Sequence, residues 1–410
     1  MPSQILTLSK KLSLAEVLIV KLFDKLPNGS LHLEWPDGTE YNFGNGQGTC
    51  ANIRVTNESF FLKCVMYGDI GFAESYMDGD WHTNSLADVI SWFIINLDHN
   101  PLLAGKGLKR LTGNFMRILN KVYHYSRKNT LTGARKNISE HYDLGNDFYT
   151  LFLDETMTYS SAIFKTPDQS LEEAQVEKYD RLCRQLDLQS TDHLLEIGSG
   201  WGGMAEHAVK NYGCRVTTVT ISQEQYTYAR DRFQRLGISD QVDVRMQDYR
   251  MIQGQFDKIV SIEMLEAVGH EFLPVYFKKV GELLKPGGKL GLQVITSRDK
   301  RYEEFRKDVD FIQKHIFPGS QTPSLSAIQS AIAKSADLAL YDLKDIGLDY
   351  GRTLRLWFER FNHHHDQVRK QGMDDRFIRK WNYYLQYCEA AFKLQHITVL
   401  QLLYVQPKPL

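Results

Sequence analysis

Glycines and a carboxylate of the kind that bind a small polar ligand cluster in residues 193–203. Gly198, Gly200 and Gly203 have the spacing G-x-G-x-x-G after a short apolar run that reads as a strand. Glycine lets such a turn adopt positive φ and approach a ligand closely, and the helix predicted to follow would offer unpaired backbone N–H groups. Glu196 stands two residues before the first glycine, where its carboxylate favours a cationic or hydroxyl-rich ligand over a pyrophosphate.

The strand predicted after this turn, residues 214–220, separates two classes of ligand. A NAD-binding unit usually carries Asp or Glu at the end of that strand, about 20 residues after the turn, to bind the ribose. No acidic residue stands there, so the E-x-G-x-G turn instead resembles that of S-adenosylmethionine (SAM) methyltransferases. A packing turn in another α/β domain is the alternative, because the motif is short.

Strand and helix patterns alternate through residues 193–295 and must position these groups. Apolar runs at residues 216–220, 242–246, 256–262 and 289–295 are separated by helical patterns, which predicts a doubly wound parallel sheet. The ligand crevice of that fold lies at the carboxyl ends of its strands. The polar residues at or near those ends are Glu196, Gln225, Asp248, Glu266 and Gln293.

Length and composition limit the number of domains and the classes of function. Single cores stop growing near about 250–300 residues, so a chain of 410 residues predicts two domains. The formal net charge of −1 gives no nucleic-acid footprint, and five scattered cysteines predict neither disulfides nor a metal site. No apolar run reaches the roughly 18 residues of a membrane span, and we see no signal peptide. We therefore expect a cytoplasmic protein whose membrane contact is peripheral, on the inner face.

Three segments are predicted along the chain. Residues 1–100 read as an α+β accessory domain, which we hypothesise to bind lipid, with a hairpin over residues 29–43. Residues 101–137 form a basic amphipathic linker that could lie on an anionic membrane, although a solvated linker helix is the alternative. Its basic residues, which no Asp or Glu interrupts, are Lys106, Lys109, Arg110, Arg117, Lys121, Arg127, Lys128, Arg135 and Lys136. Residues 138–410 are predicted to form the catalytic domain.

Several stretches in this last segment occur together in one known family. They are HYDLGNDFYTLFLDETMTYSSAIF, LLEIGSGWGGMA, VTISQEQ, QDY, SIEMLEAVGHEF, IFPG and DYGRTLRLWFERF, spanning about residues 138–402. The chain resembles the cyclopropane-fatty-acid synthase family of SAM-dependent methyltransferases, which includes mycolic acid methyltransferases. The resemblance implies a Rossmann-like class I SAM methyltransferase domain with an N-terminal accessory domain, and a homodimer is a weaker expectation from the family.

The resemblance also implies which residues bind SAM. Those expected near its amino-acid part are Tyr159, Ser160, Glu196, Gly198 and Gly200. Those expected near its ribose and adenine are Thr220, Gln225, Asp248 and Tyr249.

Family members hold a bicarbonate ion as general base, and the resemblance implies the same site here. Glu266, Ile295 and Tyr350 match the family pattern. Ser161 stands where Cys is usual and Gln293 where His is usual, and Ala267 replaces the His of an F-E-H-like motif. Ser and Gln both donate hydrogen bonds, so an anion site is retained, but an imidazole that could carry a proton is lost.

The expected reaction transfers the methyl group of SAM to a cis double bond of an unsaturated phospholipid acyl chain. The resulting carbocation would lose a proton to close a cyclopropane, and water must be excluded meanwhile. Aromatic faces can stabilise the cation, and the candidates are Tyr142, Tyr159, Phe317, Tyr350 and Trp357. Three alternatives stay open: a methyl- or methylene-branched product, N-methylation of a small molecule, and a non-catalytic lipid-binding protein.

Overall fold

The computed structural model describes residues 12–97, 133 and 144–408. The basic linker at residues 101–137 lies almost entirely outside the described residues, as does Tyr142, so what we expect of them stays a prediction. The described chain groups into two units. The first comprises residues 1–123, 310–316 and 365–396, and the second comprises residues 124–309, 317–364 and 397–410. We expected residues 138–410 to form one continuous domain, but residues 310–316 and 365–396 within this range belong to the first unit.

The first unit is built on a four-stranded sheet with the order β2-β1-β3-β4. Strands β1 (Gly29–Glu34) and β2 (Glu40–Gln47) pair antiparallel, which confirms the predicted hairpin. The remaining elements are β3 (Cys50–Val55), β4 (Trp81–His82), α1 (Leu14–Phe23), α2 (Ser59–Met77), α3 (Leu86–Asn96), α13 (Phe311–His315), α16 (His365–Lys370) and α17 (Asp375–Lys393). Helix α17 packs against α2 and α3, which explains why a segment so late in the chain belongs to this unit.

The second unit contains a seven-stranded sheet with the order β10-β11-β9-β8-β5-β6-β7. Its parallel part confirms the predicted doubly wound fold and comprises β5 (His193–Ile197), β6 (Arg215–Thr220), β7 (Val242–Met246), β8 (Phe256–Ile262) and β9 (Leu284–Ser297). Strands β10 (Ala339–Asp345) and β11 (Ile397–Val405) extend it antiparallel beyond β9.

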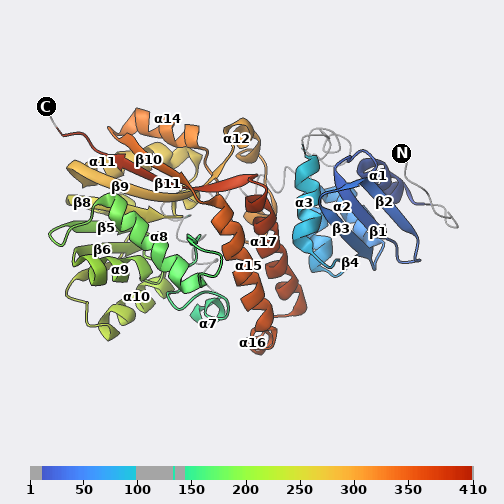
Figure 1. The fold of residues 1–410 in the computed structure, drawn as a ribbon, viewed down its shortest axis with the longest axis horizontal. Coiled ribbons are helices and arrows are strands. Elements are labelled where there is room, and N and C mark those ends of the chain that lie inside the picture. The colour runs from blue at the N-terminus through green and yellow to red at the C-terminus, as the bar shows by residue number, and fades with distance from the viewer. Residues whose placement is uncertain (1–11, 98–132, 134–143, 409–410) are drawn as a thin grey trace. The chain divides into compact units, whose positions relative to one another are not determined.

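Helices cover both faces of this sheet (Figure 1). One face packs on α8 (Leu171–Leu186), α9 (Gly203–Tyr212) and α10 (Gln223–Arg235) through one apolar cluster. The other packs on α11 (Leu273–Leu283) and α14 (Leu325–Ser335) through a second cluster. The unit also contains α7 (Asn146–Tyr149), α12 (Asp299–Phe305), α15 (Gly347–His363) and short 3₁₀ helices at Tyr249–Met251, Leu265–Ala267 and His270–Phe272.

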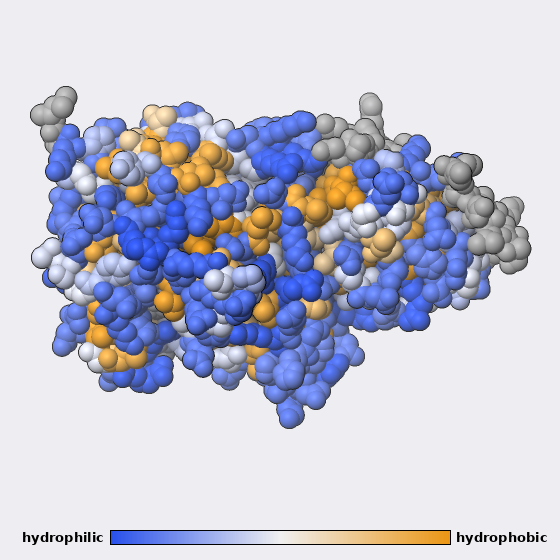
Figure 2. All heavy atoms as spheres, viewed as in Figure 1, coloured by the Kyte–Doolittle hydropathy of each residue, from blue (hydrophilic) through white to orange (hydrophobic). Residues whose placement is uncertain are grey.

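Local sequence accounts for several of these boundaries. Ser170 and Glu173 form a capping box at the start of α8. The left-handed conformation at Gly213 ends α9, as glycine commonly does at helix C-termini. On the face drawn in Figure 2, hydrophobic residues form separate patches among hydrophilic ones. Within the described residues, no helix is long and apolar enough to cross a membrane.

Candidate active site

The glycine-rich turn joins β5 to α9 at the carboxyl edge of the sheet. Gly198 and Gly200 both have positive φ, at 97° and 49°, which L-residues with a side chain rarely adopt. The backbone N–H groups of Gly198 and Ser199 donate to the carbonyl of Val219 at 3.0 Å, which anchors the turn to the end of β6. A Cβ added at Gly200 would meet no atom within 4 Å, so this side of the turn faces open space.

Glu196 lies on β5 directly beneath this turn. Its side chain is buried and accepts a hydrogen bond from the Thr218 hydroxyl of the neighbouring strand at 2.6 Å. Burial raises the pKa of Glu196 to about 8, against the opposing effects of Thr218 and Lys178. A ligand ammonium group beside the turn would favour the ionised form of Glu196, which accepts hydrogen bonds.

The next two strands supply the other predicted SAM residues. The Thr220 hydroxyl donates to Gln225 Oε1 at 2.8 Å, so these two side chains lie together at the end of β6. Asp248 follows β7 and is buried, and its carboxylate accepts from the Arg250 guanidinium at 2.7 Å. Tyr249 begins a 3₁₀ helix after it. Along with Glu196 and the glycine turn, these groups lie at the carboxyl edge of the sheet, where the ligand crevice of a doubly wound fold is expected.

Ser160 contacts Lys178, a residue that was not predicted to belong to the site. The buried ammonium of Lys178 donates to Ser160 Oγ at 2.6 Å. Burial lowers the pKa of Lys178 to about 7, although Glu263, Asp154 and Glu196 oppose the shift. Its signal in the sequence was a lysine four residues after Ala174 and four before Leu182, on the apolar face of α8.

An aromatic cluster adjoins Ser160. The ring of Tyr159 lies 5.3 Å from that of Trp357 and 6.2 Å from that of Phe317. Tyr350 extends the cluster, with its ring 5.9 Å from Trp357. Four of the five predicted cation-stabilising residues therefore lie together, and Tyr142 is the one outside the described residues. Their faces can stabilise a developing positive charge where water is excluded.

Three predicted catalytic residues converge on a carboxylate that was not predicted, that of Glu263. Its Oε1 accepts from the Ser161 backbone N–H at 2.9 Å and from Gln293 Nε2 at 2.8 Å. Its Oε2 accepts from the Tyr350 hydroxyl at 2.9 Å. The side chain is partly buried and comes from the residue that directly follows β8. The signal in the sequence was a second carboxylate three residues before Glu266, at the end of the same strand.

Glu266 and Ile295 form a separate pair beside this cluster. The Ile295 backbone N–H donates to Glu266 Oε1, while no described group hydrogen-bonds to the buried Oε2. Burial, and then the nearby Glu263 carboxylate, raise the pKa of Glu266 to about 8. Glu266 therefore holds its proton at neutral pH, unlike a carboxylate that accepts several hydrogen bonds.

The donors expected to hold bicarbonate are already engaged by the chain. The Ser161 hydroxyl, expected to donate to the ion, donates to the carbonyl of Ala162 at 3.0 Å instead. The Gln293 amide donates to Glu263 and to the Ser161 carbonyl, and its Oε1 accepts from Gln401 at 2.9 Å. Glu263 takes up the donors of Ser161, Gln293 and Tyr350, so among the described residues of this set only the buried Oε2 of the protonated Glu266 stays unused, and one donor alone does not fit a bicarbonate ion.

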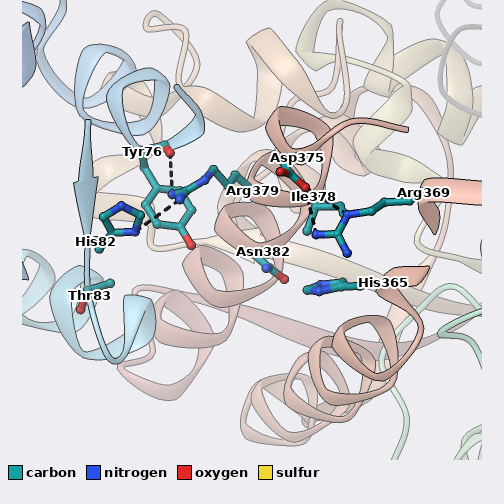
Figure 3. Close-up of a pocket in the computed structure, with 9 residues that line it drawn as sticks. All are labelled: Tyr76, His82, Thr83, His365, Arg369, Asp375, Ile378, Arg379 and Asn382. Atoms are coloured by element: carbon teal, nitrogen blue, oxygen red, sulfur yellow. Dashed lines mark hydrogen bonds and ion pairs between the residues drawn. The ribbon is translucent and has the colours of Figure 1, made fainter. Parts of the chain in front are cut away.

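A cavity of about 300 Å³ lies in the first unit (Figure 3). Arg379 reaches the Tyr76 carbonyl and His82 Nδ1, both at 3.3 Å, and Arg369 pairs with Asp375 at 2.9 Å. None of the predicted site residues lines this cavity, so it is separate from the candidate active site. Among the described residues, no group of His, Cys, Asp and Glu is arranged to hold a metal ion.

A mostly parallel seven-stranded sheet with a buried acid beneath a glycine turn at its carboxyl edge defines the class I SAM-dependent methyltransferases, and this protein is one of them. The family model of mycolic acid cyclopropane synthetase matches residues 129–402, and the chain belongs to that family.

Its similarity to individual relatives is extensive. It is 37% identical over 386 residues to a tuberculostearic acid methyltransferase of Mycobacterium tuberculosis, covering 92% of this chain and 88% of the relative. It is 35% identical over 356 residues to a cyclopropane-fatty-acyl-phospholipid synthase of Escherichia coli, covering 86% and 87%. The solved structure of the cyclopropane synthase MmaA2 from M. tuberculosis superposes with a TM-score of 0.62 at 30% identity, covering 66% of this chain and 98% of that one. A related synthase, CmaA1, at 29% identity and a TM-score of 0.61 over 66% of this chain and 98% of that one, was solved with SAH, which supports SAM as the methyl donor.

Proposed function

We propose that the protein transfers the methyl group of SAM to a cis double bond of an unsaturated phospholipid acyl chain, with a cyclopropane as the product. The observation that carries this proposal is the juxtaposition of an aromatic cluster with a buried carboxylate cluster beside the predicted SAM residues. Tyr159 and Ser160 are consecutive, and Tyr350 belongs to both clusters. An alkene is a weak nucleophile, so its reaction needs orientation, cation stabilisation and a base at one place.

Each part of the site has a task in this reaction. SAM supplies an electrophilic methyl group. Glu196 and the glycine turn bind and orient the donor, since a small misplacement of reacting atoms is costly. The rings of Tyr159, Phe317 and Trp357 stabilise the cation and keep water from capturing it as an alcohol. A base then removes a proton, and which proton is removed decides the product.

A branched chain formed without ring closure is the second candidate product. The similarity to a relative named tuberculostearic acid methyltransferase, over 92% of this chain, favours it. The replacement of the usual His by Gln293 also favours it, because the fate of the cation depends on the groups around the base.

The test uses the whole protein with SAM and liposomes of cis-monounsaturated phospholipid. Fatty acid esters from the reaction are analysed by mass spectrometry before and after mild hydrogenation, with a reaction lacking SAM as the control. A gain of one methylene that resists hydrogenation is the expected result and identifies a cyclopropane. A product of the same mass that takes up hydrogen identifies a branched alkene. No modified chain, with SAM still bound, would refute an acyl double bond as the acceptor.

A further inference from the structure

The Glu263 carboxylate accepts hydrogen bonds from three of the residues that were expected to bind bicarbonate. An ionised carboxylate offers about four lone-pair positions. Three of them accept from Ser161, Gln293 and Tyr350, at 2.9, 2.8 and 2.9 Å. One position on Oε2 is left, and the side chain is only partly buried. Three donors from separate elements thus hold the carboxylate, and one lone-pair position on Oε2 accepts no hydrogen bond from the described residues.

The backbone at Glu263 gives an independent indication of function. Its φ is 49°, in the left-handed region where glycine is favoured. A residue with a side chain costs about 1–2 kcal/mol there. Such strain clusters at functional sites, where the surrounding structure holds it in place. The conformation also implies that glycine could replace Glu263 without a backbone penalty.

We propose that Glu263 is the general base of the reaction and takes the place that a diffusible bicarbonate ion would otherwise fill, so that turnover needs no bicarbonate. This inference rests on the proposed function, because it names the proton acceptor of that reaction. Ser161, Gln293 and Tyr350 then act as positioning residues that fix the Glu263 carboxylate.

With Glu263 as the base, the proposed reaction balances in protons and electrons. The alkene π pair forms the new carbon–carbon bond, and the S–CH₃ pair stays on sulfur, which leaves as a neutral thioether. A lone pair of Glu263 takes the proton from the cation. The freed C–H pair closes the ring, or forms a new double bond in the branched product. Glu263 then returns its proton to solvent after product release.

The charges that face Glu263 suit this role. Burial raises its pKa, which strengthens it as a base, and the Gln293, Ser161, Lys178 and Tyr350 groups lower it. The charge of the nearby Lys178 ammonium favours the ionised form of Glu263. Glu266, which holds its proton, adds no competing negative charge at neutral pH.

The experiment compares the wild type, Glu263→Gly and Glu263→Gln in buffer purged of carbon dioxide, with and without millimolar bicarbonate. SAM affinity by calorimetry and thermal melting confirm that each variant is folded. We expect the wild-type rate to change less than twofold on adding bicarbonate. Glu263→Gly should lose at least about 100-fold, the usual contribution of a general base, and regain at least tenfold with bicarbonate. Glu263→Gln should lose as much and regain nothing, because its amide fills the space.

Two results would overturn the proposal: a wild type that requires bicarbonate, or a Glu263→Gly variant within tenfold of the wild type in purged buffer. Either would leave the proposed function standing. A wild type that binds SAM but methylates no acyl chain under any condition would instead refute the proposed function, and the base assignment with it.

Discussion

Glu263 and Glu266 lie three residues apart and are held in different ways. Glu263 accepts three hydrogen bonds, whereas Glu266 accepts one, from the Ile295 backbone. Burial raises the pKa of both carboxyl groups, so their different hydrogen bonds, rather than their pKa values, distinguish their tasks. We assign proton acceptance to Glu263, and we expect Glu266 to remain a neutral group that orders the start of the loop after β8.

The neutral state of Glu266 predicts a specific pH dependence of stability. The folded protein keeps this proton up to a pKa of about 8, while the unfolded chain releases it near the ordinary glutamate pKa of 4.5. The folded state therefore loses stability as pH rises between these values. Glu266→Gln cannot ionise and should escape a loss on the order of 2–4 kcal/mol between pH 5.5 and 8.5. Urea unfolding at both pH values measures it, with the exposed Glu282→Gln as control. Parallel behaviour of all three proteins would contradict the assignment.

If Glu263 is the base, the charge of Lys178 should affect the pH below which activity falls. Its charge lowers the pKa of Glu263. Lys178→Met should therefore move the acid limb of kcat/KM upward by roughly one pH unit. Ser160→Ala removes the hydrogen-bond partner of Lys178 but no charge, so its limb should stay in place. An unmoved limb in Lys178→Met would show that the two charges do not interact in the working enzyme.

The sequence predicted the partners of this cluster better than its centre. Ser161, Gln293 and Tyr350 were identified by resemblance, and the structure brings them together on one carboxylate. Glu263 was missed because a motif fixes the order of residues along the chain but not the direction of their side chains. Its positive φ, which turns the side chain into the site, is a property of the folded backbone alone.

At the scale of elements, two glycines of the turn are expected to have different roles. Gly200 should matter for cofactor binding and Gly202 for stability. Gly200 faces open space, whereas a Cβ at Gly202 would lie 2.7 Å from the Phe233 ring, with φ at 93°. Gly202→Ala should destabilise by about 2–4 kcal/mol through backbone strain and overpacking. Gly200→Ala should cost only about 1 kcal/mol yet weaken SAM binding at least tenfold. Urea unfolding and SAM calorimetry on both variants test this pairing. Unchanged SAM affinity in Gly200→Ala would place the cofactor elsewhere.

The parallel strands were predictable because each is a buried apolar run followed by a helical pattern. The two strands at one edge of the sheet, β10 and β11, were not predictable from the sequence. Strands β10 and β11 are separated by α15, α16 and α17, and nothing local in their sequences fixes an antiparallel register. Residues 299–301 begin helix α12, and residues 60–63 lie in α2 although their short apolar run would fit a strand equally well.

At the scale of the whole molecule, the proposed phospholipid substrate would bring the protein into contact with a membrane. We propose that the basic linker makes this contact, since each cation near an anionic surface contributes about 1 kcal/mol. Replacing Lys106, Lys109 and Arg110 by Gln should reduce cosedimentation with anionic liposomes about tenfold or more. Zwitterionic liposomes should be bound weakly by both proteins, and added salt should remove the difference. Equal binding of the variant to anionic liposomes would exclude this part of the linker.

The passage of the chain between its two units, which occurs five times, constrains how the protein is made. The Ala87 N–H in α3 donates to Gln386 of α17, 299 residues later. Ribosomes add about 5–20 residues per second, so the apolar face of α3, including Val89 and Trp92, waits roughly 15–60 s for the helix that covers it. The first unit to be translated is thus among the last to be completed. We therefore expect chaperones that bind nascent apolar segments to occupy α3 until translation has passed residue 396.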